Sequence, residues 1–286
     1  MTAPPPRADG HDPMPRARAV RWSAAAPLAV ALSAALVVFL TLPVIALLVA
    51  ASPANLLAGL SHEIVGPALV LSVATTGASL LIIVVCGTPL AWWLARTRSR
   101  SARWMETALQ LPAVIPPAVA GIALLLTFGR RGLVGGALDR AGLGVAFSAA
   151  AVVMAQVFVS APFYLSSAVV AFARLDDNML AAARSLGASP ARVFFLVALP
   201  LSRPGLVAAA AMSWARALGE FGATLMFAGN MAGRTQTLPL AIYSALESDL
   251  GAAQALSVVL VAVAFGLLVL LTMIRRWQRP RDVAPM

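Results

Sequence analysis

The sequence predicts an all-α integral membrane protein with six membrane-spanning helices, and three observations support this fold class. Of the 286 residues, 60% are hydrophobic and only 11% are charged, whereas a water-soluble chain carries about 25% charged residues. The apolar residues gather in runs long enough to cross a bilayer as helices, which takes about 20 residues. These runs lack the alternation of apolar and polar residues typical of strands in a membrane barrel. A soluble enzyme, a disordered chain and a secreted disulfide-rich domain are therefore excluded.

The expected helices follow one another along residues 24–274, which form the predicted transmembrane domain. The first run is too long for the apolar core of a signal peptide, so we expect it to remain as a spanning helix. A later run is interrupted only by Arg216 and Glu220. Residues 1–23, rich in proline and arginine, are predicted to be a disordered tail, and residues 275–286 a second tail. The six predicted spans are 24–51, 64–95, 107–129, 141–173, 204–233 and 250–274.

Arginine placement predicts the orientation in the membrane. All 21 basic residues are arginines, and groups of four lie in the N-terminal tail, after the second helix, after the fourth helix and at the C-terminus. Sixteen therefore share one side, which the positive-inside rule identifies as the cytoplasm, together with both termini. The net charge of +10 is thus assigned to orientation in the lipid bilayer, and we expect no nucleic-acid partner.

No catalytic or cofactor-binding motif is recognisable in the chain. A phosphate-binding loop requires a lysine, and the sequence has none. The two histidines, His11 and His62, lie in a tail and in a predicted outer loop, so they cannot build a histidine-rich metal site. Cys86 lies in an apolar run and is expected to pack as a small apolar side chain. We therefore expect no enzymatic activity, and neither a metal nor a cofactor bound by this chain.

The cytoplasmic loop 174–203 has the pattern of two short helices joined by a sharp turn. Asp177 favours a helix start, and Gly187 is typical of a helix end that requires left-handed backbone. A Ser-Pro pair then starts a second helix. Pro200 and Pro204 are expected to break the chain before the fifth spanning helix. The loop is therefore predicted to be a compact helix–turn–helix knob.

This loop resembles the hallmark loop of the permease subunits of bacterial ABC importers. That hallmark reads Glu-Ala-Ala, three residues, Gly, nine or ten residues, then a hydrophobic residue, any residue and Leu-Pro. Ala181 stands where the family has Glu, and we hypothesise that Asp177 or its neighbour Asp176 compensates. The resemblance implies that the loop forms a coupling helix that docks into a separate ATPase subunit. The residues at the positions of the frame are Ala181, which departs from it, and Ala182, Ala183, Gly187, Leu199 and Pro200, which match it.

Two further stretches, 111–135 and 217–243, resemble the molybdate branch of that family. The resemblance covers roughly residues 64–274 and implies the type I ABC importer permease fold in a bacterial cytoplasmic membrane. It implies a homodimer, two copies of an ATPase subunit that uses the ATP, and an extracytoplasmic molybdate-binding protein. Sulfate or thiosulfate and tungstate are alternative substrates. An ion-driven secondary transporter is the alternative from another class, although the sequence offers only Glu220 as a mid-membrane ion site.

Two features of the predicted spans are candidates for the pathway or its gate. Arg216 and Glu220 are four residues apart and share one face of a helix, and charges in lipid usually face a bundle interior or a pathway. They form either a pair that fixes helix packing or a pathway lining. Pro116 and Pro117 are expected to kink the third helix, as a pathway wall, a hinge or a simple bend. A short outer amphipathic helix is predicted over 237–246.

Overall fold

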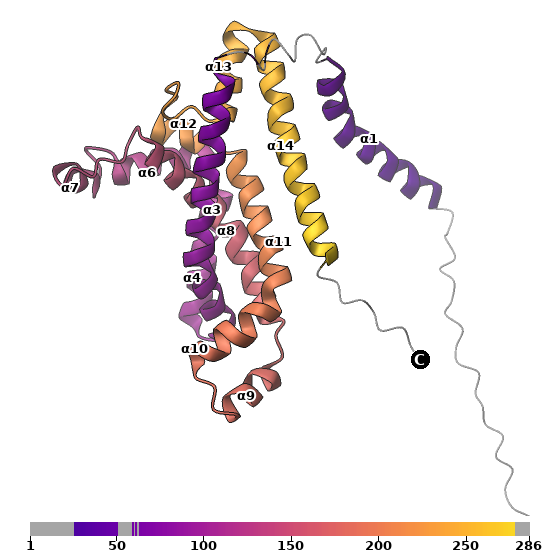
Figure 1. Cartoon of the computed structure of the whole chain (residues 1–286), viewed down its shortest axis with the longest axis vertical. Coiled ribbons are helices and arrows are strands. Elements are labelled where there is room, and N and C mark those ends of the chain that lie inside the picture. The colour runs from indigo at the N-terminus through magenta and orange to yellow at the C-terminus, as the bar shows by residue number, and fades with distance from the viewer. Residues whose placement is uncertain (1–25, 51–58, 60, 62, 278–286) are drawn as a thin grey trace, which may run out of the picture. The chain divides into compact units, whose positions relative to one another are not determined.

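The computed structural model describes residues 26–50, 59, 61 and 63–277, and every regular element among them is helical (Figure 1). The chain divides into two units, Met1–Val49 and Ala50–Met286, which we describe separately. The predicted tail 1–23 lies outside the described residues. Of the predicted tail 275–286, the first three residues continue the last helix and the rest lies outside the described residues.

The first unit contains helix α1 (Ala26–Ala50). Its 25 residues include no charged side chain, and apolar residues surround the helix axis on all sides. A helix of this kind belongs in a membrane or a deep core. It matches the first predicted span, and its length suffices to cross a bilayer.

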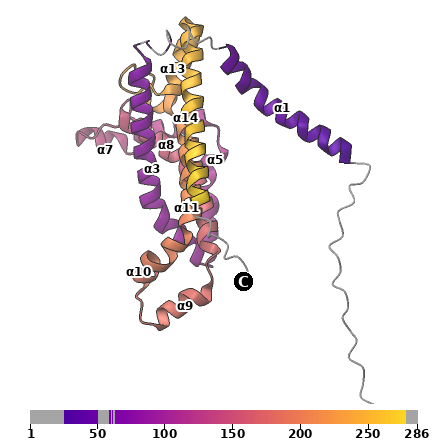
Figure 2. The ribbon, with the colours of Figure 1, turned by 45° about the vertical axis from the view of Figure 1, so that its right-hand side comes forward.

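Three long helices form the centre of the second unit. They pack against one another in both views (Figures 1 and 2), with a core that includes Ile83, Tyr164, Phe172 and Leu206. The last helix packs along one of them and against the short outer helix that the sequence predicted. The three long helices are α3 (Val65–Arg96), α8 (Ala149–Ala173) and α11 (Leu199–Leu218). The short outer helix is α13 (Leu238–Ser248), and the last helix is α14 (Leu250–Trp277). Five described helices are long and apolar enough to span a membrane, and the number rises to the six predicted if a bent helix pair counts as one span.

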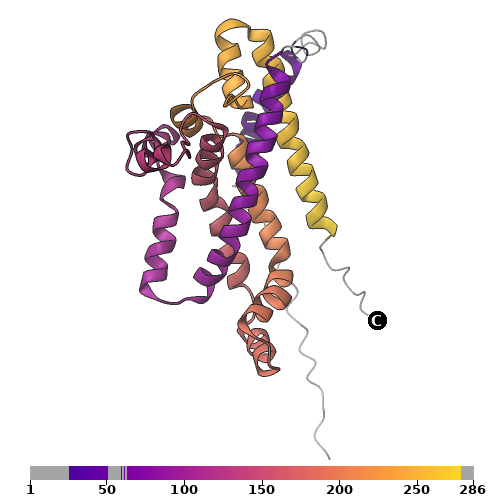
Figure 3. The same ribbon diagram turned by 60° about the vertical axis from the view of Figure 1, so that its left-hand side comes forward.

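The bent pair replaces the continuous third span expected over 107–129. Helices α4 (Arg100–Leu109) and α5 (Leu111–Val114) lie on one side of the break, and α6 (Pro117–Phe128) lies on the other at an angle of 112°. Figure 3 shows α4 standing beside α3. The residue before a proline avoids helical backbone, and Ile115 is accordingly extended, with a ψ of 143°. The two adjacent prolines therefore break the helix outright, where the sequence predicted only a kink.

The fourth span begins at Ala149 and not at residue 141 as predicted. Helix α7 (Gly135–Arg140) and a loop come first, and Gly142 and Phe147 in that loop have positive φ angles of 73° and 61°. The hydroxyl of Ser148 accepts from the backbone N–H of Ala151 and caps α8. Lack of charge marked the loop as membrane-embedded, but its backbone geometry excludes helix.

The prediction of a fifth span over 204–233 is also wrong. The helix runs over Pro190–Leu218, and a separate α12 (Gly222–Ala228) follows it. Pro200 and Pro204 lie inside the span and do not break it. A π-helical turn, η1 (Phe194–Ala198), directly precedes Leu199. Because a π turn is wider than an α turn, it relieves the contact between a proline ring and the carbonyl four residues earlier.

Candidate functional site

The predicted knob lies at one end of the second unit, opposite the end that carries α13 (Figures 1 and 2). It consists of α9 (Asp177–Ser185) and α10 (Pro190–Val193), and α10 continues through η1 into α11. The Asp176 carboxylate accepts from the backbone N–H of Asn178 at 2.8 Å and caps α9. Gly187 ends α9 with a φ of +85°. The predicted helix–glycine–helix arrangement is therefore confirmed.

The knob has one face against the protein and one face free. Leu180 and Val193 are buried in the core between the three long helices. Ala181 and Ala182 are exposed, Ala183 is half-buried, and the side chain of Leu186 is 89% exposed. The exposed alanines and leucine are apolar side chains that a protein partner could cover, beside the exposed Arg184 of the same helix. Position 181, where the resembling family has a glutamate, contributes an alanine to this surface.

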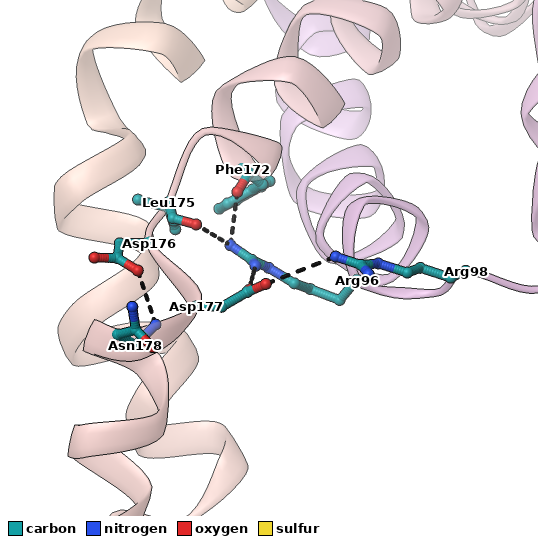
Figure 4. A network of polar contacts seen from close by, with 7 residues as sticks. All are labelled: Arg96, Arg98, Phe172, Leu175, Asp176, Asp177 and Asn178. Carbon is teal, nitrogen blue, oxygen red and sulfur yellow. Dashed lines mark hydrogen bonds and ion pairs between the residues drawn. The ribbon is translucent and has the colours of Figure 1, made fainter.

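Asp177 is directed toward its own chain. Its carboxylate pairs with Arg96 at 2.5 Å and approaches Arg98 at 3.8 Å, and both arginines come from the end of α3 and the link after it (Figure 4). The structure thus gives this carboxylate two partners within the chain. That Asp177 replaces the family's Glu at a contact with the ATPase stays a prediction.

Leu199 and Pro200 lie one helical segment away from the knob. They line a cavity of about 400 Å³ between α3, α8 and α11. Most of its lining is apolar, and the exposed Arg203 and the hydrogen-bonded pair of Thr88 and Tyr164 supply its polar groups.

Arg216 and Glu220 lie at the junction between α11 and α12. Nη1 of Arg216 contacts Oε2 of Glu220 at 2.8 Å, so the two side chains pair, although α11 ends at Leu218 and Glu220 lies in the link after it and not on the helix face expected from the sequence. The other oxygen, Oε1, accepts from the backbone N–H of Ala223 at 2.8 Å, in the first turn of α12. The Glu220 side chain is 1% exposed and that of Arg216 is 27% exposed. The carboxylate therefore joins the end of one helix to the start of the next.

The breaks in the third and fifth spans lie side by side. A Cβ added to Gly222 would come within 2.9 Å of Cβ of Pro117, and one added to Gly121 would come within 2.7 Å of the Ala223 carbonyl oxygen. The backbones of α6 and α12 are thus in direct contact. The structure brings the segment of Pro116 and Pro117 next to the turn that holds Glu220, which sequence reasoning did not anticipate.

Polar contacts between the long helices were also missed. The Gln156 amide of α8 donates to Thr75 of α3 at 3.2 Å. The Ser72 hydroxyl accepts from the backbone N–H of Leu238, at the start of α13, at 2.7 Å. The signal for this network is the spacing of polar residues along the apolar α3 run, which places them on one helix face. Its buried members on α3 are Ser72, Thr75, Thr76 and Ser79.

A second cavity, of about 550 Å³, lies beside α7, which projects from the side of the unit (Figure 1). Arg130, Asp139 and Arg234 line it, and Arg130 lies 3.8 Å from Asp139. Near the end opposite the knob, Tyr243 of α13 packs on Phe221 with ring centroids 5.4 Å apart. A hydrogen bond to the Glu247 carboxylate raises the pKa of the Tyr243 hydroxyl.

Residues 87–281 match the model of a protein family described as binding-protein-dependent transport system inner membrane component. The chain is 45% identical to the molybdenum transport system permease protein ModB of Mycobacterium tuberculosis, over 80% of this chain and 86% of that protein. It is 36% identical to ModB of Escherichia coli K12, over 71% and 90%. The probable transport system permease protein NifC of Clostridium pasteurianum is 35% identical, over 86% of both chains.

Solved structures of transporters share the fold. A bacterial ABC transporter for the import of alginate superposes with a TM-score of 0.71 at 16% identity, covering 90% of this chain and 97% of that chain. The MetNI methionine ABC transporter, in an inward-facing conformation, gives a TM-score of 0.60 at 19% identity, covering 74% and 95%. At such identities the likeness establishes the fold, which is that of ABC importer permeases.

Proposed function

Because the chain belongs to the family of inner-membrane components of binding-protein-dependent transport systems, we propose that it is the permease subunit of an ATP-driven molybdate importer. The observation that carries the substrate is the identity of 36–45% to relatives named as molybdenum transport permeases, over most of their length. The chain is a multi-pass protein of the cytoplasmic membrane, and its partners are expected to include an ATPase and a solute-binding protein.

The knob supports the proposed contact with the ATPase. Its free face, with Ala181, Ala182 and Leu186, is offered to a partner, while Leu180 ties it to the long helices. We propose that two permease copies form a homodimer and that each knob docks on one of two ATPase subunits, which bind and hydrolyse the ATP. Closure of the ATPases would move the knobs together and open the permease outward. Hydrolysis would return the permease to the inward-facing state.

The adjacent breaks of the third and fifth spans support a role in the pathway. Discontinuous helices are tolerated in a membrane where they are buried in protein or line a cavity. Arg216 alone would attract an oxyanion, but its pairing with Glu220 at 2.8 Å leaves little net charge. This suits a pathway that must release its anion. A molybdate-binding protein on the outer side would then supply most of the substrate specificity.

The test is uptake of radiolabelled molybdate into proteoliposomes that contain the permease, the ATPase and the binding protein, with sulfate and tungstate as competitors. We expect uptake that requires ATP and is inhibited weakly by sulfate. Preference for sulfate would overturn the substrate and leave the fold untouched. Uptake that follows an ion gradient without ATP would instead favour a secondary transporter.

A further inference from the structure

Arg96, the last residue of α3, contacts the polypeptide where α8 ends and the knob begins (Figure 4). Its Nη1 donates to Oδ1 of Asp177 at 2.5 Å. Its Nη2 donates to the carbonyl oxygens of Phe172 at 2.7 Å and Leu175 at 3.4 Å. These acceptors belong to the last turn of α8, to the link after it and to the first turn of α9. One guanidinium group therefore joins the end of α3 to three consecutive parts of the chain, 76 to 81 residues away.

An aromatic cluster lies beneath this guanidinium group. Cζ of Arg96 is 4.9 Å from the centroid of the Trp92 ring, a distance at which a cation is attracted to the ring face. Trp92 in turn packs on Phe172 of α8 and on Phe194 of η1, with centroids 5.4 and 5.8 Å apart. The Arg96 side chain is only 20% exposed. The end of α3 is thus fastened to both ends of the knob, at α9 through Arg96 and at η1 through Trp92.

We propose that Arg96 is a positioning residue for coupling to the ATPase: it fixes α9 to α3, so that displacement of the knob moves α3. The proposal rests on the proposed function of the chain as an importer permease. The direct route from the knob into α11 passes through the π turn η1, and π turns are a common cause of bends in helices. A hinge there would absorb part of the displacement. The contacts of Arg96 provide a second connection that avoids η1.

The residue type fits this role. Arginine presents several donors in a rigid planar fork, whereas lysine is a flexible point charge. In this structure the fork serves a carboxylate and two carbonyl oxygens at the same time. Lysine could satisfy fewer of these acceptors in a fixed geometry. We therefore expect Arg96→Lys to be intermediate between the wild type and Arg96→Gln.

Hydrogen exchange of the permease in lipid nanodiscs tests the positioning, without any transport. In Arg96→Gln, the backbone amides of α9 should exchange about tenfold faster, since the charged hydrogen bonds of Arg96 to the start of α9 and to the chain before it are lost and α9 opens more readily. Arg98→Gln is the matched control, because the Arg98 side chain is 94% exposed and approaches Asp177 only to 3.8 Å. It should leave α9 unchanged. Equal exchange in Arg96→Gln and the wild type would overturn the proposal.

The ratio of oxyanion imported to ATP hydrolysed tests whether movement of the knob is passed to α3 through Arg96. Arg96→Gln should assemble with the ATPase yet lower this ratio by about fivefold or more, within the range of coupling between sites. Arg98→Gln is again the control and should keep the wild-type ratio, because the Arg98 side chain is 94% exposed and approaches Asp177 only to 3.8 Å. An unchanged ratio in Arg96→Gln would refute transmission through Arg96. A wild-type complex that imports another oxyanion in place of molybdate would contradict the proposed substrate alone, and the ratio would then be measured with that oxyanion.

Discussion

Two arginine–carboxylate pairs of this chain differ in reach and in burial. Arg216 and Glu220 are four residues apart, on either side of the end of α11, and the carboxylate is almost completely buried. Arg96 and Asp177 are 81 residues apart, and the Asp177 side chain is 71% exposed. Removing one partner of a buried pair leaves an uncompensated charge, which is strongly destabilising. An exposed pair contributes little to stability. The two arginines are similarly exposed, at 20% for Arg96 and 27% for Arg216, so the difference lies in the carboxylates. We therefore expect the pair with the buried carboxylate to matter more for folding and the pair with the exposed carboxylate to matter more for position.

Neutralising Arg216 should cause the largest loss of stability among the variants that test this difference. Arg216→Gln leaves the Glu220 carboxylate buried with a single described donor, the N–H of Ala223. Loss of one partner of a buried pair costs about 3–5 kcal/mol, and we expect a value near the lower end because Arg216 is partly exposed. Thermal unfolding in nanodiscs, followed by tryptophan fluorescence, measures the change. Stability equal to that of the wild type would contradict the assignment of this pair to folding.

Glu220→Gln and the double variant are the matched controls. Glu220→Gln should destabilise less than Arg216→Gln, because the arginine left behind can turn toward water and the new amide oxygen can still accept from Ala223. The double variant should recover part of the loss, since no unpaired charge remains. Transport and ATPase rates of Glu220→Gln address the pathway separately. Full transport by this variant would leave the pair a role in packing alone.

Replacing Gly187 affects the knob without touching either pair. The φ of this residue is +85°, and no atom lies within 4 Å of the place that a Cβ would take, so Gly187→Ala introduces backbone strain and no steric clash. The cost of left-handed backbone is about 1–2 kcal/mol for alanine. Asn tolerates this conformation better, so Gly187→Asn should be milder. Hydrogen exchange at the end of α9 measures both. If the two variants behave alike, backbone strain is not the reason for glycine at this position.

The knob could be predicted from the sequence because its determinants are local. The Asp176 cap acts within two residues and the left-handed Gly187 at a single position. The locations of the helix breaks were harder to predict. Absence of charge placed 141–148 in the membrane, although its backbone is a loop, and Pro200 was interpreted as a helix breaker although it lies inside a span after a π turn. Hydropathy reports the environment of a segment and not its backbone conformation.

The Arg96 contacts could not be predicted for a different reason. The sequence assigned Arg96 only to the basic loop that orients the chain in the membrane. Its partners at Phe172, Leu175 and Asp177 lie 76 to 81 residues away, and no local pattern indicates such a pairing. The contact of Pro117 with Gly222 has the same character. Long-range contacts depend on how the helices pack, which a single sequence does not reveal.

The smallest effect we expect is a difference between the two pairs in how hydrogen exchange responds to salt. Ions screen exposed charges more than buried ones, and the Debye length falls from about 10 Å at 0.1 M to about 3 Å at 1 M ionic strength. High salt should therefore weaken the contact of Arg96 with the exposed Asp177 carboxylate and speed exchange in α9 by a factor of less than about five, as for an exposed pair worth under 1 kcal/mol. Hydrogen exchange of the α12 amides should not respond to salt, because the Glu220 carboxylate that accepts from the first turn of α12 is buried. In the double variant Arg96→Gln/Arg98→Gln the salt response of α9 should disappear, because both cations that approach Asp177 are then gone. A response that persists in this variant would show that another charge holds α9, and the two pairs would then no longer differ in the way their burial indicates.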